Sequence, residues 1–218
     1  MIVQGTAEWL NARAGSLGSS SFHEAIAKKR DGKWGASRES LMGRLAAERL
    51  TGMAVETYKS AAMKWGNMVE PEARAEYAFF KEVDIVEVGL IRHPRIFGTH
   101  CSPDGLIGDD GGVEFKCPES HTHINTLMTG KIPHAYRVQI QWHMAVTGRK
   151  WWDYVSYDPR FPAELQTFEK RILRDEAAIK EMEEQAEDFV KDLESKVAAL
   201  CTARGIPIPT AEWLKEAA

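Results

Sequence analysis

The sequence is poor in cysteine, with three in 218 residues, at positions 101, 117 and 201. No two of them form a Cys-x-x-Cys pair. An odd number of scattered cysteines argues against a disulfide framework and against a cysteine-rich zinc site. We therefore expect a protein that works in a reducing, cytoplasmic compartment.

Targeting segments, repeats and linkers are also missing. Residues 1–10 lack the basic start and apolar stretch of a signal peptide, and no apolar run approaches the ~18 residues that a membrane helix needs. The chain has no internal repeat and no tract rich in proline, glycine or serine that could separate domains. Its length suits one well-packed core. We expect a single domain over 1–218 and no membrane partner.

The chain has no excess of positive charge, with 28 Lys and Arg against 32 Asp and Glu and a formal net charge of −4, but its charges are unevenly spread. Residues 9–49 contain eight Lys or Arg against four Asp or Glu, and residues 116–150 contain five against one. Residues 164–196 contain six against eleven, so the acidity lies mainly in one C-terminal segment. The local field matters more to a phosphate than the total charge does. The two basic segments therefore leave a nucleic-acid partner open.

The spacing of apolar residues predicts helices first and a mixed order afterwards. Helical intervals occur over 8–13, 20–30, 37–51 and 61–82, with the serines at 19–21 as candidate caps and Gly52 as a helix end. Strands are predicted over 83–91, 96–102, 113–117 and 151–157, with a helix over 134–147. A long helix is predicted over about 162–200, opened by Pro162. This order predicts a mixed α/β (α+β) fold, with a central mixed sheet flanked by helices.

The most informative stretch runs from Cys101 to Pro118. Asp104 lies in the turn signal Pro-Asp-Gly, and a second turn signal at 109–112 precedes the strand over 113–117. Glu114 and Lys116 are two residues apart on that strand, so their side chains point to the same face. A hairpin would bring Asp104 back beside Glu114. Two carboxylates and one ammonium then converge.

This arrangement suits cleavage of a phosphodiester with magnesium. Mg²⁺ is usually held by one or two carboxylates, several waters and a substrate phosphate. Asp104 and Glu114 supply the carboxylates, and the Phe115 carbonyl could add a ligand. The metal lowers the pKa of a bound water, which Lys116 could orient or deprotonate, its own pKa lowered by the metal. We expect Mn²⁺ to substitute for Mg²⁺, and Ca²⁺ not to support turnover.

Each fragment also has a simpler interpretation. Pro-Asp-Gly is a tight turn, and Glu-Phe-Lys is common in exposed strands; only the combination of Asp, nine residues, Glu, one residue and Lys favours a nuclease. His121 and His123 have strand-like spacing without an evident third ligand, so we expect a surface loop there rather than a metal site. Cys101 and Cys117 flank the site and are equally explained as small core residues.

The Asp…Glu-x-Lys arrangement resembles the restriction-endonuclease-like, or PD-(D/E)xK, nuclease superfamily. Over most of its length the chain resembles the bacteriophage lambda exonuclease family, the YqaJ-type viral recombinases, with core nuclease motifs at about 61–157. Three further segments carry this resemblance: an opening motif with Trp9, Arg13, Gly15 and Ser20, a Gly66-x-x-x-Glu70 helix, and the segment with Tyr136, Gln139 and Gln141.

The resemblance implies roles for residues outside the hairpin. Glu70 would contribute a metal ligand, directly or through water. Gln139 would lie beside Lys116 and hold the attacking water or the scissile phosphate. Arg13, Ser20 and Ser102 match family positions that form a pocket for a 5′-terminal phosphate, and a guanidinium with two hydroxyls suits a phosphate monoester.

Taken alone, these residues have ordinary structural explanations. Arg13 would be a solvated charge, Ser20 a helix cap, Glu70 before Pro71 a helix start, and Gln139 a buried amide. The alignment of Ser20 is uncertain by one residue, because serines occupy 19–21.

The resemblance also implies an activity and an assembly. The activity is a Mg²⁺-dependent exonuclease that digests one strand of linear duplex DNA from its 5′ end and leaves a 3′ single strand for an annealing recombinase. The assembly is a trimeric ring around the DNA, in a bacterial or phage-infected cell. Two alternatives stay open: an endonuclease of the same superfamily, restriction or branch-cutting, and a DNA-binding protein that has lost catalysis. No segment suggests a base-reading module, and the presence of Asp104, Glu114 and Lys116 argues against lost catalysis.

Overall fold

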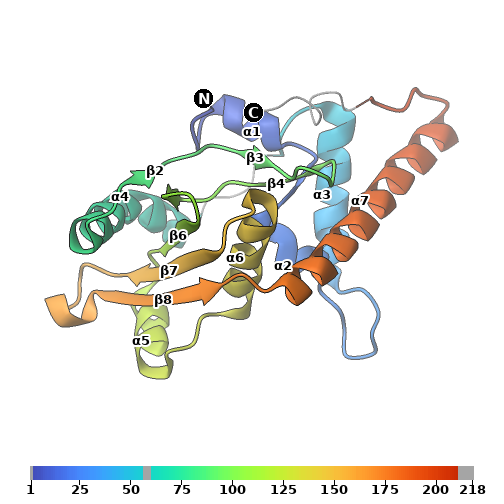
Figure 1. The fold of residues 1–218 in the computed structure, drawn as a ribbon. Coiled ribbons are helices and arrows are strands. Elements are labelled where there is room, and N and C mark those ends of the chain that lie inside the picture. Colours follow the sequence, from blue (N-terminus) through green and yellow to red (C-terminus); the bar gives the residue numbers. More distant parts are fainter. Residues whose placement is uncertain (1, 56–59, 211–218) are drawn as a thin grey trace.

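The strands lie in two sheets, drawn in Figure 1. This computed structural model describes residues 2–55 and 60–210. The small sheet has the order β1 (Leu17–Gly18), β4 (Thr99–Cys101) and β3 (Ile91–Arg92). The large sheet has the order β2 (Ile85–Val86), β5 (Gly105–Ile107), β6 (Gly111–Lys116), β7 (Trp151–Tyr157) and β8 (Thr167–Leu173). β6 and β7 run parallel and the other pairs of this sheet antiparallel, so the large sheet is mixed, as predicted.

Helices cover both faces of the large sheet. The helices of the described residues are α1 (Ala7–Arg13), α2 (Phe22–Ala25), α3 (Ala36–Thr51), α4 (Ala61–Lys81), α5 (Ser120–Thr129), α6 (His134–Thr147) and α7 (Glu176–Arg204), with 3₁₀ turns η1 (Ser19–Ser21) and η2 (Ala163–Leu165). α5 and α6 form the crossover that the parallel strands β6 and β7 require. The predicted bounds of α6 and β7 are confirmed, and α3 ends at Gly52, whose φ of 70° suits a helix end. None of the described helices is long and apolar enough to cross a membrane.

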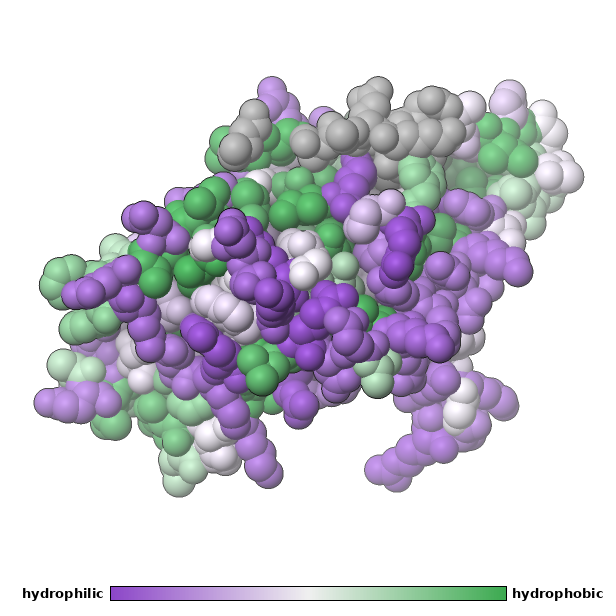
Figure 2. Space-filling view, in the orientation of Figure 1, coloured by the Kyte–Doolittle hydropathy of each residue, from purple (hydrophilic) through white to green (hydrophobic). Residues whose placement is uncertain are grey.

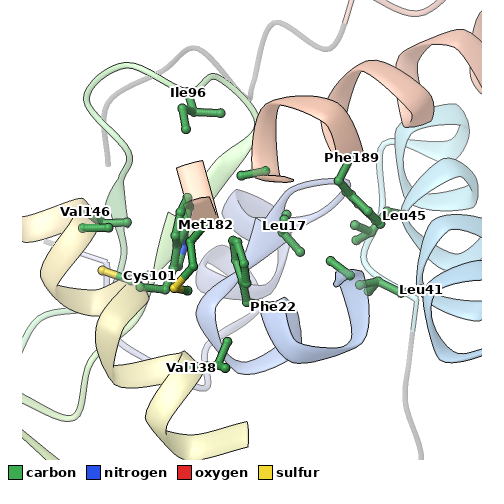
Figure 3. Packing of buried hydrophobic residues seen from close by; sticks show 14 of the residues in the cluster. Leu17, Phe22, Leu41, Leu45, Ile96, Cys101, Val138, Val146, Met182 and Phe189 are labelled. Atoms are coloured by element: carbon green, nitrogen blue, oxygen red, sulfur yellow. The ribbon is translucent and has the colours of Figure 1, made fainter. Parts of the chain in front are cut away.

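Two apolar clusters divide the faces of the large sheet. On one face, α4 packs Val69 and Tyr77 against Val113 and Phe115 of β6. On the other face, Trp152 of β7 joins the larger core that α2, α3, α6 and α7 build, part of which Figure 3 shows. Side chains alternate across a strand. Glu114, between Val113 and Phe115, therefore faces α6.

Residues 167–173 form the edge strand β8, so the prediction of one long helix over 162–200 is wrong for this segment. Leu165, Phe168 and Ile172 have helical spacing, but all seven residues of β8 pair with β7. Cross-strand packing outweighs a local periodicity of this kind. The helix α7 begins only at Glu176, after Asp175, whose side chain accepts hydrogen bonds from two N–H groups of the first turn.

The predicted helix over 20–30 is also wrong beyond its first turns. α2 ends at Ala25, and Ser21 before it makes no side-chain cap. Residues 27–35 form a loop that projects from the body between α2 and α3 (Figure 1). Gly32, with a φ of 80°, reverses the chain there, and Lys28 pairs with Trp34 across the loop. Gly32 and Gly35 make a continued helix over 27–35 unfavourable, whatever the apolar spacing before them.

The predicted strand over 83–91 is split between the two sheets, as β2 and β3. Gly89 lies in the break, where the N-terminal segment crosses so closely that a Cβ on Gly89 would be 1.8 Å from the Ile2 carbonyl oxygen. Residues 120–129 form α5 rather than a surface loop. His123 is fully buried, with Nδ1 2.8 Å from Ser156 Oγ and Nε2 2.8 Å from the Leu165 carbonyl.

Gly111 and Gly112 begin β6 instead of completing a turn. A Cβ would lie 2.0 Å from the Trp151 ring at Gly111, and 2.4 Å from the Trp152 ring at Gly112. The two indoles of β7 thus lie over the two glycines of β6. The glycines are needed for this contact between strands, because no larger residue leaves room for the rings.

Candidate active site

The β5–β6 hairpin brings Asp104 beside β6, as predicted. Gly105 pairs with Val113 in the antiparallel register, and Asp104 Oδ2 accepts a hydrogen bond of 2.7 Å from the Phe115 N–H. The N–H and C=O of one strand residue point to the same side. The Phe115 carbonyl therefore faces the Asp104 side of β6, away from β7.

Glu114 lies at the centre of the site, with 1% of its surface exposed. Its Oε1 atom accepts hydrogen bonds from Lys116 Nζ, at 2.6 Å, and from Gln139 Nε2, at 2.5 Å. Gln139 is on α6, which faces this side of β6. The Lys116 ammonium also lies 4.9 Å from the centre of the Tyr136 ring, one turn earlier on α6. Asp104, Glu114, Lys116 and Gln139 are thus brought together.

His143 completes the site, and sequence reasoning missed it. Its Nε2 atom lies 2.9 Å from Glu114 Oε2, on the opposite oxygen from Lys116. His143 follows Gln139 by four residues on α6, so both side chains point to the same face of the helix. That spacing is a signal in the sequence that could have identified it.

Burial and neighbouring charges shift the pKa values of the hairpin residues in different directions. Burial raises the pKa of Asp104 well above its usual range, and the charges of Glu114 and Glu70 raise it further. Burial also disfavours the charged form of Glu114, but Lys116 and His143 outweigh it and hold the pKa of Glu114 below its usual range. Burial alone would lower the pKa of Lys116, yet Glu114 and Asp104 raise it. The pKa of Lys116 is therefore raised here by its carboxylate neighbours, and the lower lysine pKa expected with a bound metal remains a prediction.

Glu70 lies inside α4, not at a helix start, and close enough to interact with the hairpin charges. Its Oε1 atom accepts a hydrogen bond of 2.6 Å from Arg74, which also pairs with Glu87 at 2.7 Å. Burial raises the pKa of Glu70 and Arg74 lowers it, while Glu114 adds to the rise. Glu70 therefore lies near enough to the hairpin for its charge to act on Asp104, while its hydrogen bond is to Arg74.

Of the three residues of the predicted phosphate pocket, Arg13 ends α1, Ser20 lies in η1, and Ser102 directly follows β4. Gly18 pairs with His100 in the parallel strands β1 and β4, so Ser20 and Ser102 follow these strands at equivalent positions. Arg13 stacks 4.4 Å above the Trp9 ring, whose Nε1–H donates to Ser102 Oγ at 3.1 Å. Trp9 thereby connects Arg13 to Ser102. Ser20 is exposed.

Positive charge gathers around Arg13. Burial lowers the pKa of its guanidinium, Arg44 lowers it further, and Glu48 opposes both. Some arginines of residues 9–49 are already paired with carboxylates, which reduces the positive charge they offer to a phosphate. Arg38 pairs with Asp192 at 2.7 Å and Arg49 with Glu194 at 3.7 Å, so the acidic helix α7 neutralises part of the first basic segment.

The donor set fits magnesium better than a cage-bound metal. Within 2–55 and 60–210, no three His, Cys, Asp or Glu side chains converge so as to hold a metal ion by themselves. Mg²⁺ requires fewer protein ligands, because it keeps several waters and takes oxygen from the substrate phosphate. Asp104 and Glu114, whose charges destabilise each other, offer two such carboxylates. A divalent cation would relieve that repulsion.

A mixed sheet with Asp104, Glu114 and Lys116 on a central hairpin, between α4 and α6, defines a nuclease of the restriction-endonuclease-like superfamily. Within that class, the chain belongs to the YqaJ-like viral recombinase family, whose family model matches residues 8–150.

Solved structures agree with this assignment. Two structures of LHK-Exo, an alkaline exonuclease from Laribacter hongkongensis, one in complex with dAMP, are 42% identical to the chain, cover 92% of it and 98% of their own length, and have a TM-score of 0.86. A phage-related exonuclease from Haemophilus somnus is 16% identical, covering 83% of this chain and 96% of its own, with a TM-score of 0.58, and shows the shared fold alone. None of the curated proteins compared with the chain matches it. Family and fold together support a DNA exonuclease.

Proposed function

We propose that the chain is a Mg²⁺-dependent 5′-to-3′ exonuclease that degrades one strand of linear duplex DNA and leaves 3′ single strands for annealing. The observation that carries this proposal is that the predicted phosphate pocket and the β5–β6 hairpin are directly connected along the chain. Ser102, held by the Trp9 that stacks on Arg13, is two residues from Asp104, which lies against the catalytic strand. A strand end bound at Arg13 and Ser102 is then held at a fixed place relative to the hairpin.

Each residue of the hairpin site has a role in this reaction. A bound divalent cation would lower the pKa of a water and stabilise charge on the phosphate. Asp104 and Glu114 would hold that cation, with the Phe115 carbonyl and Glu70 as further oxygen donors. Lys116 would orient the attacking water or take its proton. Gln139 would hold the water or the scissile phosphate.

The loop over 27–35 supports a path for the DNA backbone. Its exposed cations are Lys28, Lys29, Arg30 and Lys33, against the single acidic residue Asp31. Figure 2 shows this hydrophilic segment extending beyond the body of the protein. Lys and Arg that project in this way suit contacts with phosphates without reading sequence. The basic segments 9–49 and 116–150 would line the DNA path, and the acidic face of α7 would lie outside it.

Linear and closed circular duplexes distinguish this function from its alternatives. With Mg²⁺, we expect degradation of a linear duplex from its 5′ ends and no cutting of a covalently closed circle of the same sequence. Cutting of the circle would instead identify an endonuclease. Binding without cutting of either DNA would identify a protein that has lost catalysis.

Replacement of Arg13 by Ala is expected to narrow the difference in digestion rate between 5′-phosphorylated and 5′-hydroxyl ends. A terminal phosphate carries an extra charge and an extra free oxygen, which a guanidinium and two hydroxyls can bind. Loss of that contact misplaces the reacting phosphate, and a shift of ~1 Å can cost ~10²-fold in rate. The measurement is the ratio of initial rates on the two kinds of end.

Arg95, an exposed arginine that pairs with Glu183 on α7, provides the control. Arg95→Ala should leave the ratio unchanged. An unchanged ratio in Arg13→Ala as well would mean that Arg13 is an ordinary surface charge.

We further propose that the chain forms a homotrimeric ring around the DNA and that a single-strand annealing protein takes up the product strand, in the cytoplasm of a bacterial or phage-infected cell. A ring that surrounds its substrate would keep it bound between cleavage steps. Light scattering at micromolar concentration should give the mass of three chains. A monomer under these conditions would exclude the ring.

A further inference from the structure

The His143 imidazole is completely buried, and its contact with Glu114 distinguishes it from a packing residue. The residue has 0% of its surface exposed, and Nε2 lies 2.9 Å from Glu114 Oε2. A carboxylate oxygen can only accept, so the imidazole donates its Nε2–H. Among the described residues, the other ring nitrogen, Nδ1, has no hydrogen-bond partner. A polar ring is costly to bury, and the hydrogen bond that this ring makes is to Glu114 on β6.

The surroundings of the ring fix its orientation. The His143 ring stacks on the Trp152 indole, with centroids 5.1 Å apart and planes 24° apart. The indole in turn lies over Gly112, where a Cβ would be 2.4 Å from it. The backbone of α6 holds His143 from the other end. The imidazole therefore has little freedom to turn away from Glu114.

The two oxygens of Glu114 have different partners. Oε1 accepts from Lys116 and Gln139, the residues assigned above to the water and the phosphate. Oε2 accepts from His143. Lys116 and Gln139 must exchange their contact with Glu114 for contacts with reactants, so they cannot hold the carboxylate throughout the reaction. His143 is buried beneath the site and can.

We propose that His143 is a positioning residue, which fixes the Glu114 carboxylate for a divalent cation before that cation binds. The inference rests on the proposed function, since it takes Glu114 as a cation ligand. His143 itself is not a ligand here, because its Nε2 atom is directed at Glu114. It acts on the cation through the carboxylate, as partners behind metal ligands do.

Calcium titration of the folded protein tests this role without turnover. By calorimetry, His143→Leu is expected to bind Ca²⁺ about 10–100-fold more weakly than wild type, the usual effect of removing a group behind a metal ligand. His143→Gln should keep most of the affinity, because its amide nitrogen lies the same number of bonds from Cβ as Nε2 does. In cleavage assays, His143→Leu should raise the Mg²⁺ concentration for half-maximal rate more than it lowers the rate at saturating Mg²⁺.

His123 supplies a matched control. It is also fully buried, but its ring nitrogens contact Ser156 and the Leu165 carbonyl instead of Glu114. His123→Leu should lower the melting temperature and leave the Ca²⁺ affinity unchanged. If His123→Leu weakened Ca²⁺ binding as much as His143→Leu does, the loss of affinity in both variants would come from general loosening of the fold. The positioning role of His143 would then be overturned.

The outcomes separate this inference from the proposed function. If wild type binds neither Ca²⁺ nor Mg²⁺, or if Glu114→Gln binds them equally well, the metal site itself is wrong. If wild type binds and Glu114→Gln does not, but His143→Leu matches wild type, the inference alone is overturned. Should His143→Leu not fold, His143→Asn replaces it, since its amide is one bond too short to reach Glu114. Equal affinities of the Asn and Gln variants would then overturn the inference.

Discussion

Asp104→Asn, Glu114→Gln and Lys116→Ala are each expected to abolish strand degradation, with rates lower by at least the ~10²-fold that a positioned catalytic group contributes. The folds should survive. In Asp104→Asn the amide oxygen can still accept the hydrogen bond from the Phe115 N–H that Asp104 Oδ2 accepts now. Glu114→Gln and Lys116→Ala leave the β6–β7 pairing intact. Initial rates on a 5′-phosphorylated linear duplex, with circular dichroism for folding, make the measurement.

Asp104→Asn carries a second expectation with a definite sign. The folded-state pKa of Asp104 is raised, first by burial and then by Glu114 and Glu70, so its ionised form destabilises the metal-free fold at neutral pH. The melting temperature of the Asn variant should therefore be no lower than that of wild type. The difference in its favour should be larger at neutral pH, where Asp104 of wild type is forced to ionise, than at acidic pH. Asp110→Asn, on an exposed pair with Lys150, is the control and should keep full activity. Near-wild-type cutting by Glu114→Gln in Mg²⁺ would show that the active site is elsewhere.

Removal of divalent cations is expected to stop the reaction entirely, and Mg²⁺ or Mn²⁺ to restore it. Ca²⁺ should permit DNA binding without turnover, because its larger and looser ligand shell positions a water poorly. Addition of Mg²⁺ or Ca²⁺ should also raise the melting temperature of the protein. A cation bound to the native state relieves repulsion among Glu70, Asp104 and Glu114.

The melting experiment has its own control. In Asp104→Asn the repulsion is already reduced, so the cation should raise the melting temperature less than in wild type. Cleavage in chelator at the Mg²⁺ rate, or equal rates in Ca²⁺ and Mg²⁺, would contradict a magnesium-dependent mechanism.

The geometry of the β5–β6 hairpin could be predicted because its signals are local. A turn at Asp104 and an alternating strand through Glu114 and Lys116 need only a few residues on each side to define their geometry. The helix over 134–147 and the strand over 151–157 could also be predicted, because Gly148 separates two apolar segments of suitable length. The family resemblance then supplied Glu70 and Gln139, whose positions depend on how α4 and α6 pack on the sheet.

What could not be predicted depends on contacts between distant segments. β8 is a strand because seven of its residues pair with β7, and nothing within 162–173 shows that β7 lacks a partner on that edge. His123 looked like a surface residue, because its partners are 33 and 42 residues away. His143 follows Gln139 by four residues, a spacing that the sequence shows. The orientation of its ring, however, depends on Trp152 of β7 and Gly112 of β6, which are distant from it along the chain or lie on other elements.

The parallel pairing of β6 with β7 also bears on the moment at which the chain first becomes active during its own synthesis. Glu114 and Lys116 leave the ribosome early, yet their strand lacks its neighbour until residues 151–157 have followed, and that neighbour remains an unpaired edge until residues 167–173 emerge. Pairing across so long a stretch of chain closes late in folding. A growing chain that stops before residue 173 thus carries Glu114 and Lys116 without the complete sheet that aligns them.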